Sequence, residues 1–134
     1  MYVFLGDYPK DDVPRAEYIR LDKHDTYDVS TTISYIIVPL LKQFRATTHG
    51  APLADVTRSS LPNHILKEIA FLLELDPSID PCFYAWDWIL GEMIYGFESH
   101  RAEDDSSYMC SLHENERQQN GLMLFAKYFK HLWY

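Results

Sequence analysis

A stripe of polar and charged side chains follows one face of a predicted helix within residues 25–52, DTYDVSTTISYIIVPLLKQFRATTHGAP. Its members are spaced 4, 3, 4, 3 and 4 apart and are Thr31, Tyr35, Val38, Lys42, Arg45 and His49. Residues at this spacing share one side of an α-helix. Arginine gives phosphate two parallel hydrogen bonds, lysine gives it a point charge, and tyrosine offers a flat ring for stacking. The stripe therefore suits a phosphorylated or nucleotide-like ligand.

Hydroxyl and aromatic side chains flank this stripe at both ends, with Thr26 and Tyr27 before it and Thr47 and Thr48 near its end. The predicted ligand-binding set is Thr26, Tyr27, Thr31, Tyr35, Lys42, Arg45, Thr48 and His49. In this hypothesis the cationic side chains meet phosphate, the rings or one tryptophan stack on a base, and the threonines bind sugar or phosphate. The alternative is a solvated helix face, because the helix dipole favours cations near the C-terminal end.

The tryptophans form a second candidate group. They could stack on bases, but tryptophans more often lie in a core or an interface. Residues 82–100 are apolar on more than one side of a predicted helix, which places that helix in the domain centre or at an oligomer interface. We therefore expect a homo-oligomer. The predicted interface residues are Trp86, Trp88, Tyr95 and Trp133.

The sequence contains none of the common catalytic or metal-binding motifs. The six histidines form neither HxH nor HExxH, which predicts that the chain holds no metal. Glu92 is isolated, while Glu114 and Glu116 lie two apart and so point to different sides of a helix. Neither GxSxG nor a phosphate-binding loop occurs, and Ser59 and Ser60 have no recognisable partner. The pattern favours a binding protein without a cofactor over an enzyme.

Composition narrows the class of partner. The chain has 134 residues and a formal net charge of −8, which argues against a general binder of duplex nucleic acid. Hydrophobic residues make up 47%, enough for a packed core. No apolar run approaches the roughly 20 residues that span a bilayer, and MYVFLGDYPKDD is not a signal peptide. We expect a soluble, intracellular protein that does not enter a membrane.

The elements that position these residues form an α+β fold that is predominantly α-helical. Periodicity and turn residues predict a single domain over residues 1–134, with an N-terminal β-hairpin packed on a bundle of three to four helices. The predicted elements are a hairpin over 1–22 and helices over 28–48, 63–75, 82–100 and 112–132. A lone hairpin is marginal in water, so it must pack on helices or pair with another chain.

The core-facing side of the first predicted helix and the role of a glycine in the last one depend on how the helices pack together. The core-facing stripe of the first is predicted to be Ile33, Ile36, Ile37, Leu40, Leu41 and Phe44. Gly121 lies inside the last predicted helix, where it either permits close helix contact or breaks the helix. Residues 98–107 are rich in charge and are predicted to be a connector.

Three blocks of the sequence resemble a family of small proteins of tailed bacteriophages. The blocks are LDKHDTYDVSTTISYIIVPLLKQFRATTHGAP, WDWILGEMIYGFE and NGLMLFAKYFKHLW. The family pattern is of the kind D-T-W…I-I-x-P-x-L-K-Q…T-x-H-G-x-P, and this chain has Tyr27 where the pattern has tryptophan. The resemblance implies a phage origin and a mainly helical fold with an N-terminal hairpin. It implies no reaction.

Together these observations predict a phage-encoded, non-catalytic binding protein that acts in the host cytoplasm. Its ligand would be a small anionic nucleotide signal of host antiviral defence, which the protein sequesters. The alternative is a protein-interaction module that inhibits a host protein or assists phage assembly, with the acidic surface and the 98–107 connector facing a basic partner. A third hypothesis, a nucleotide phosphodiesterase or hydrolase, needs a carboxylate or histidine cluster that only the fold could assemble.

Overall fold

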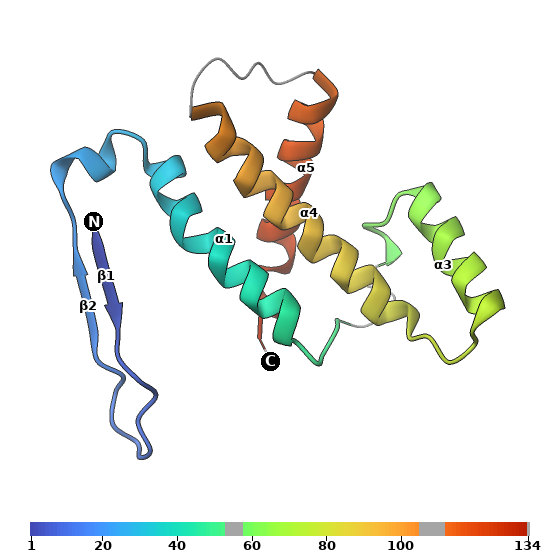
Figure 1. The fold of residues 1–134 in the computed structure, drawn as a ribbon, viewed down its shortest axis with the longest axis horizontal. Coiled ribbons are helices and arrows are strands. Elements are labelled where there is room, and N and C mark those ends of the chain that lie inside the picture. Colours follow the sequence, from blue (N-terminus) through green and yellow to red (C-terminus); the bar gives the residue numbers. More distant parts are fainter. Residues whose placement is uncertain (53–57, 105–111, 134) are drawn as a thin grey trace. The chain divides into compact units, whose positions relative to one another are not determined.

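The computed structural model describes residues 1–52, 58–104 and 112–133, with residues 102–104 described in their backbone alone. It confirms the predicted α+β, mainly α-helical class, with an N-terminal hairpin followed by helices (Figure 1). The chain divides into two compact units, Met1–Ile33 and Ser34–Tyr134.

The first unit contains the hairpin. Strands β1 (Tyr2–Leu5) and β2 (Glu17–Arg20) pair antiparallel, with Phe4 opposite Tyr18. Beyond the strands, the N–H of Gly6 donates to the carbonyl of Ala16 at 2.8 Å. Every residue of both strands is exposed. Side chains alternate between the two faces of a strand, so both faces of this hairpin present apolar residues to solvent.

Short-range hydrogen bonds connect the hairpin to the first helix. The 3₁₀ helix η1 (Lys23–Thr26) begins with a capping box. The Asp22 carboxylate accepts the backbone N–H of His24, and the Asp25 carboxylate accepts the backbone N–H of Asp22. Helix α1 (Val29–Thr47) begins after Asp28, whose carboxylate accepts the Thr31 N–H at 3.1 Å and the Thr31 hydroxyl at 2.8 Å. Asp28 thus caps the N-terminal end of α1.

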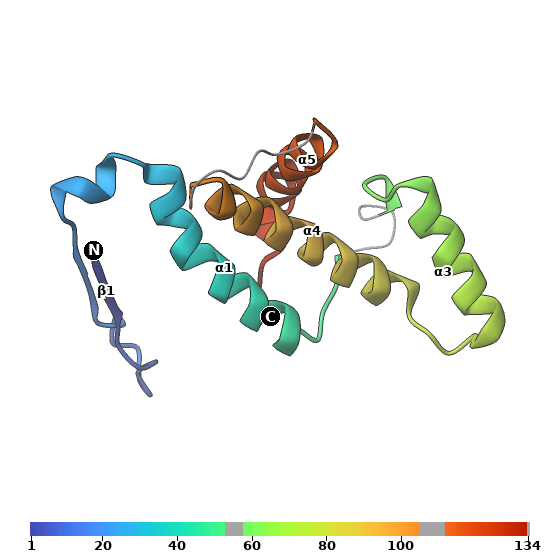
Figure 2. The same ribbon diagram turned by 45° about the horizontal axis from the view of Figure 1, so that its top comes forward.

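The second unit is helical. It contains the remainder of α1, followed by α3 (Asn63–Leu75), α4 (Pro81–Asp104), α5 (Leu112–Tyr128) and the 3₁₀ helix η2 (Phe129–His131). Helix α4 runs through the middle, with α5 crossing it and α1 alongside (Figures 1 and 2). The main core gathers on α4, where Ile89, Leu90 and Met93 are fully buried. A smaller cluster of Ile65, Ile69 and Ala85 joins α3 to α4.

The predicted helices are present, and two predicted boundaries are corrected. Helix α4 continues to Asp104, so the predicted connector over 98–107 is wrong for 98–104, while 105–107 lie outside the described residues. The predicted helix over 112–132 ends as an α-helix at Tyr128 and tightens into η2. Helical hydrogen bonding therefore extends into a charged segment, because charge does not by itself end a helix.

The predicted core stripe of α1 is correct in part, because Leu41 is buried and Ile37 and Phe44 pack against the core while partly buried. Ser34, Val38 and Leu41 are the buried positions, with at most 4% of each exposed, whereas Ile33 is 42% and Leu40 is 60% exposed. Only Leu41 of the predicted stripe is fully in the core. Tertiary context decides the rotation of the helix, because the packing of Val38 and Leu41 into the core formed by α4 turns their side of α1 inward.

Helices α4 and α5 touch through their backbones at two glycines. A Cβ added to Gly121 would lie 2.2 Å from the carbonyl oxygen of Glu92 and 3.1 Å from the Cα of Gly96. A Cβ added to Gly96 would lie 3.0 Å from the backbone nitrogen of Leu122. Helix α5 runs unbroken through Gly121. Of the two predicted roles for this glycine, close helix contact is the one observed.

The substitution Gly121→Ala is expected to destabilise the protein by about 3 kcal/mol, because backbone atoms block the new methyl group and the helices must separate. The higher helix propensity of alanine, worth about 1 kcal/mol, offsets only part of this loss. Urea unfolding followed by far-UV circular dichroism measures the change. Gly50→Ala is the control, because no atom lies within 4 Å of its added Cβ. Equal unfolding midpoints for the two variants would contradict the close contact.

Candidate functional site

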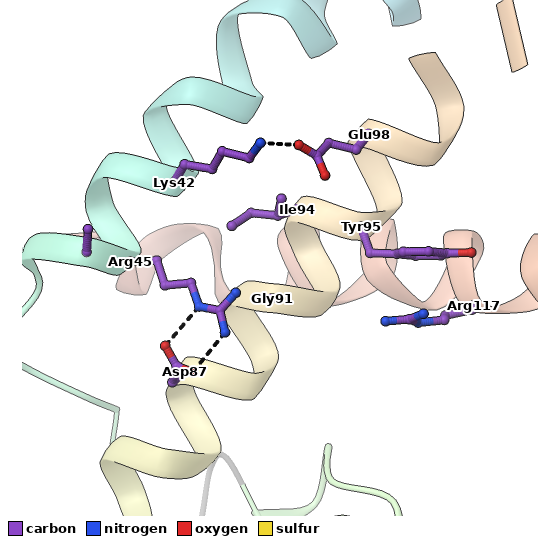
Figure 3. A pocket seen from close by; sticks show the side chains of 9 residues that line it. Lys42, Arg45, Asp87, Gly91, Ile94, Tyr95, Glu98 and Arg117 are labelled. Carbon is purple, nitrogen blue, oxygen red and sulfur yellow. Dashed lines mark hydrogen bonds and ion pairs between the residues drawn. The ribbon is translucent and has the colours of Figure 1, made fainter. Parts of the chain in front are cut away.

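An open groove of about 570 Å³ lies in the second unit where α1, α4 and α5 meet (Figure 3). Its lining residues are Lys42, Arg45, Ala46, Asp87, Gly91, Ile94, Tyr95, Glu98 and Arg117. Three of these carry a positive charge and two carry a negative charge. The groove thus joins two residues of the predicted stripe to partners on helices that follow later in the chain.

Arg45 is held against α4 by a two-point contact with Asp87. Its Nε and Nη2 donate to the two carboxylate oxygens, each at 2.8 Å (Figure 3). Gly91 makes room for the guanidinium, because a Cβ there would lie 3.1 Å from Arg45 Nη1. Hydrogen bonding to Arg45 holds the pKa of Asp87 below its ordinary value of 3.8. Because Gly91 has no side chain, the Arg45 guanidinium lies directly against the backbone of α4.

Lys42 forms a salt bridge with Glu98, which lies about three turns after Asp87 on α4 (Figure 3). In this pair 55% of the lysine side chain and 43% of the glutamate side chain remain exposed. In the Arg45–Asp87 pair the corresponding values are 39% and 52%. Salt bridges this open to water contribute about 0–1 kcal/mol. Both pairs are consequently weak enough for a bound anion to replace the carboxylate.

Arg117 is the third cation and is held differently. Its Nε and Nη2 donate to the Glu92 carboxylate at 2.9 and 2.8 Å, and only 10% of the glutamate side chain is exposed. Its guanidinium carbon lies 3.7 Å from the centre of the Tyr95 ring (Figure 3). Burial of Glu92 makes this pair harder to exchange than the other two. Arg117 thus fixes the position of the Tyr95 ring at the edge of the groove.

The other predicted ligand-binding residues of the second unit do not line the groove. The ring of Tyr35 lies under the Arg101 guanidinium at 4.1 Å. The Thr48 hydroxyl donates to the carbonyl of Gly50, and the Thr47 hydroxyl donates to the carbonyl of Gln43. His49 is exposed beyond the end of α1. Both threonine hydroxyls thus donate to nearby backbone carbonyls, which is a common local hydrogen bond of Ser and Thr side chains.

Three predicted ligand-binding residues belong to the first unit and are likewise absent from the lining of the groove. The Thr26 hydroxyl donates to the Lys23 carbonyl at 2.9 Å. Tyr27 is 75% exposed, and its ring lies 5.1 Å from that of His24. Thr31 is buried against the carboxylate of the capping residue. Local capping thus accounts for both threonines.

The predicted interface residues lie in different environments. Trp86 is 1% exposed and packs edge-on against Tyr128, so it belongs to the core of its own chain rather than to a surface that another copy could reach. Trp88 is half-buried against both core clusters, and Tyr95 lies under Arg117. Trp133 is 72% exposed. Of the four, Trp133 is the one with a largely open side chain.

Ser60 has partners that its sequence neighbourhood did not reveal. Its Oγ lies 2.7 Å from Lys127 Nζ and 2.7 Å from the Tyr128 hydroxyl, while Ser59 lies 3.4 Å from the same amine. A serine beside a lysine can be a nucleophile and its base, but desolvation is what makes a lysine basic. Lys127 is exposed. These contacts are better explained as a tether of the segment before α3 to α5.

Sequence reasoning missed Asp87, Glu98, Tyr95 and Arg117 as parts of the groove. A signal for the acidic pair exists, because Asp87, Gly91, Ile94 and Glu98 are spaced 4, 3 and 4 apart and share one face of α4. This acidic face complements the cationic face of α1. Pairing the two faces requires knowing that the helices are neighbours.

Comparison with protein-family models, with curated proteins and with solved structures finds no match. Among the residues that the structure describes, no three His, Cys, Asp or Glu side chains gather as a metal site requires. Across the same residues, no helix has the length and apolar content needed to cross a membrane. The groove is therefore the feature of the molecule that points to a function.

The contact between Arg45 and Asp87 predicts how the pKa of Asp87 changes when Arg45 is replaced. Because the pKa of Asp87 is lowered in the folded protein, the pair stabilises the fold above pH 3.8, and this stabilisation is lost as the pH falls through the lowered pKa. Arg45→Gln is expected to raise the pKa of Asp87 toward 3.8, and carboxyl-carbon NMR titration measures it. Lys42→Gln is the control, and this substitution should leave the pKa of Asp87 lowered. An unchanged Asp87 pKa in Arg45→Gln would refute the assigned cause.

Proposed function

We propose that this chain is a non-catalytic binding protein that holds a small anionic, nucleotide-like ligand in the groove. One observation carries the proposal: Lys42 and Arg45 converge on one groove, and the carboxylate that each engages there is about half exposed. The cations are positioned in advance, yet they remain available. A preformed site of this kind loses little conformational entropy when it binds.

The energies favour exchange of a carboxylate for a phosphate. Releasing Asp87 and Glu98 costs about 0–2 kcal/mol in total, because each exposed pair contributes about 0–1 kcal/mol. A phosphate group offers several acceptor oxygens, and each charge-assisted hydrogen bond that it gains contributes about 1.5–3 kcal/mol. Released carboxylates that are already about half exposed can turn into water. The exchange is therefore favourable for a ligand that contacts both cations.

Tyr95 supports a nucleotide over a simple anion. Tyr95 is one of the residues that line the groove, and its ring lies against the Arg117 guanidinium. Aromatic rings stack on bases without regard to base identity, at about 1–3 kcal/mol per base. Glu92 fixes Arg117 in turn, so the ring does not have to be ordered by the ligand. The groove thus combines a phosphate-binding end with a stacking surface.

The resemblance to tailed-phage proteins motivates the biological role within this proposal. A phage protein that sequesters a nucleotide messenger of host antiviral defence in the host cytoplasm needs tight binding and slow release. It needs neither a cofactor nor a general base. Sequestration is therefore a function that the groove could serve with the residues it has.

A second candidate is a protein-interaction module that inhibits a host protein or assists phage assembly. It is favoured by large apolar side chains on the surface of α3, where Phe71 is 57% and Leu75 is 68% exposed. The net charge of −8 would suit a basic partner. Recovery of one stoichiometric partner from infected cells, lost in Phe71→Ser with Leu75→Ser, would support this candidate. Equal recovery with the altered protein would count against it.

The groove assignment is tested with Lys42→Ala combined with Arg45→Ala. Calorimetry with a panel of cyclic di- and trinucleotides should show an affinity at least roughly 100-fold weaker than that of the unaltered protein, because two charge-assisted contacts are lost. Lys67→Ala with Lys130→Ala is the matched control, since it removes the same charge from exposed positions outside the groove. If both double variants lose affinity equally, or neither does, the groove is not the site.

A further inference from the structure

The first unit, Met1–Ile33, is too small to be stable by its own packing. Its two strands are exposed along their whole length, and a two-stranded hairpin alone is marginal in water. Units below about 40 residues usually need a disulfide, a metal or oligomerisation. Residues 1–33 contain no cysteine, and no cluster of metal-binding side chains occurs among them or elsewhere in the described residues. Of these three means, oligomerisation is the one that residues 1–33 leave open.

The positions of the hydrogen-bonded pairs in the hairpin show which backbone N–H and C=O groups point outward and can pair with another strand. Gly6 donates to Ala16, so this opposed pair is a hydrogen-bonded one. Hydrogen-bonded and non-hydrogen-bonded pairs alternate along an antiparallel ladder. Phe4 and Tyr18 are then the next hydrogen-bonded pair. It follows that residues 3 and 5 of β1, and residues 17 and 19 of β2, direct their N–H and C=O groups to the outer edges of the sheet.

The two outer edges differ in chemistry. Strand β2 carries Glu17 and Arg20, and charged residues on an edge strand oppose further pairing. Strand β1 reads YVFL and carries no charge. Val3 and Leu5, whose backbone groups point outward, are 39% and 50% exposed. An open, uncharged and apolar edge strand is a template for another strand.

We propose that the outer edge of β1 pairs antiparallel with β1 of a second copy of this chain, giving a four-stranded sheet with β2 on each outside. A two-fold axis at Phe4 sets Val3 opposite Leu5 of the other copy, so both outward-facing residues of each strand pair at once. A sheet needs at least three strands and an apolar face to be stable on its own, and a four-stranded sheet meets this requirement. The proposal is independent of the groove, which lies in the other unit.

Proline substitutions separate the two edges. Val3→Pro removes an outward N–H from β1, and Ile19→Pro removes one from β2, while neither N–H belongs to the β1–β2 ladder. Multi-angle light scattering at micromolar concentration should find two chains per particle for the unaltered protein and for Ile19→Pro. It should find a single chain for Val3→Pro. Far-UV circular dichroism should show the same helix content for all three.

Other outcomes overturn the proposal. A monomeric unaltered protein rules out pairing altogether. A Val3→Pro protein that remains a dimer moves the interface away from the β1 edge. Loss of the dimer in Ile19→Pro, with the dimer retained in Val3→Pro, assigns pairing to the β2 edge instead.

A disulfide test checks the register without relying on proline. On the two-fold axis the Phe4 residues form a non-hydrogen-bonded pair, with their Cα atoms about 4.5 Å apart, a separation that a disulfide spans. Phe4→Cys, in a chain with Cys82→Ser and Cys110→Ser, should cross-link two copies under mild oxidation. Tyr2→Cys in the same background is the control, because the register separates the Tyr2 residues by about 13 Å. Equal cross-linking of both variants, or of neither, contradicts this pairing.

Discussion

The backbones of α4 and α5 touch at Gly96 and Gly121, and the position of every groove residue on these helices depends on that contact. No side chain larger than hydrogen fits at Gly121 without moving the Glu92 carbonyl. The close approach sets Arg117, one turn before Gly121, within reach of the buried Glu92 carboxylate. Arg117 in turn lies on Tyr95. A steric constraint between two backbones thus becomes the rigid side of the groove.

The opposite side of the groove is held by weaker forces. Helix α1 contacts α4 through Val38 and Leu41 in the core and through two exposed salt bridges above it. The apolar contacts place the helix, while the salt bridges orient Lys42 and Arg45 without holding them strongly. The groove therefore combines a rigid aromatic ring with cations that can change partners. That combination supports the proposal of a site that captures an anion rather than one that transforms it.

Local patterns predicted the elements well and the contacts between them poorly. Apolar periodicity and the break at Asp76-Pro77 predicted α3 over its observed range, since both signals lie within the segment itself. The same periodicity predicted a core-facing stripe for α1 that is correct at Leu41 but wrong at Ile33 and Leu40, which are exposed. Ile33 and Leu40 are more apolar than Ser34, yet Ser34 is the fully buried residue. Likewise Lys42 and Arg45 were found from their spacing, but their partners on α4 depend on the helix packing, which no local pattern records.

The central claim is that the groove binds a small anionic nucleotide and releases it unchanged. Native mass spectrometry of the purified protein, with cyclic di- and trinucleotides and cyclic ADP-ribose isomers, tests it most directly when followed by heating and identification of what is released. The account predicts a tight complex with one of these ligands and its recovery intact. Recovery of a converted nucleotide would show an enzyme, and no binding across the panel would contradict the claim and direct attention to protein partners.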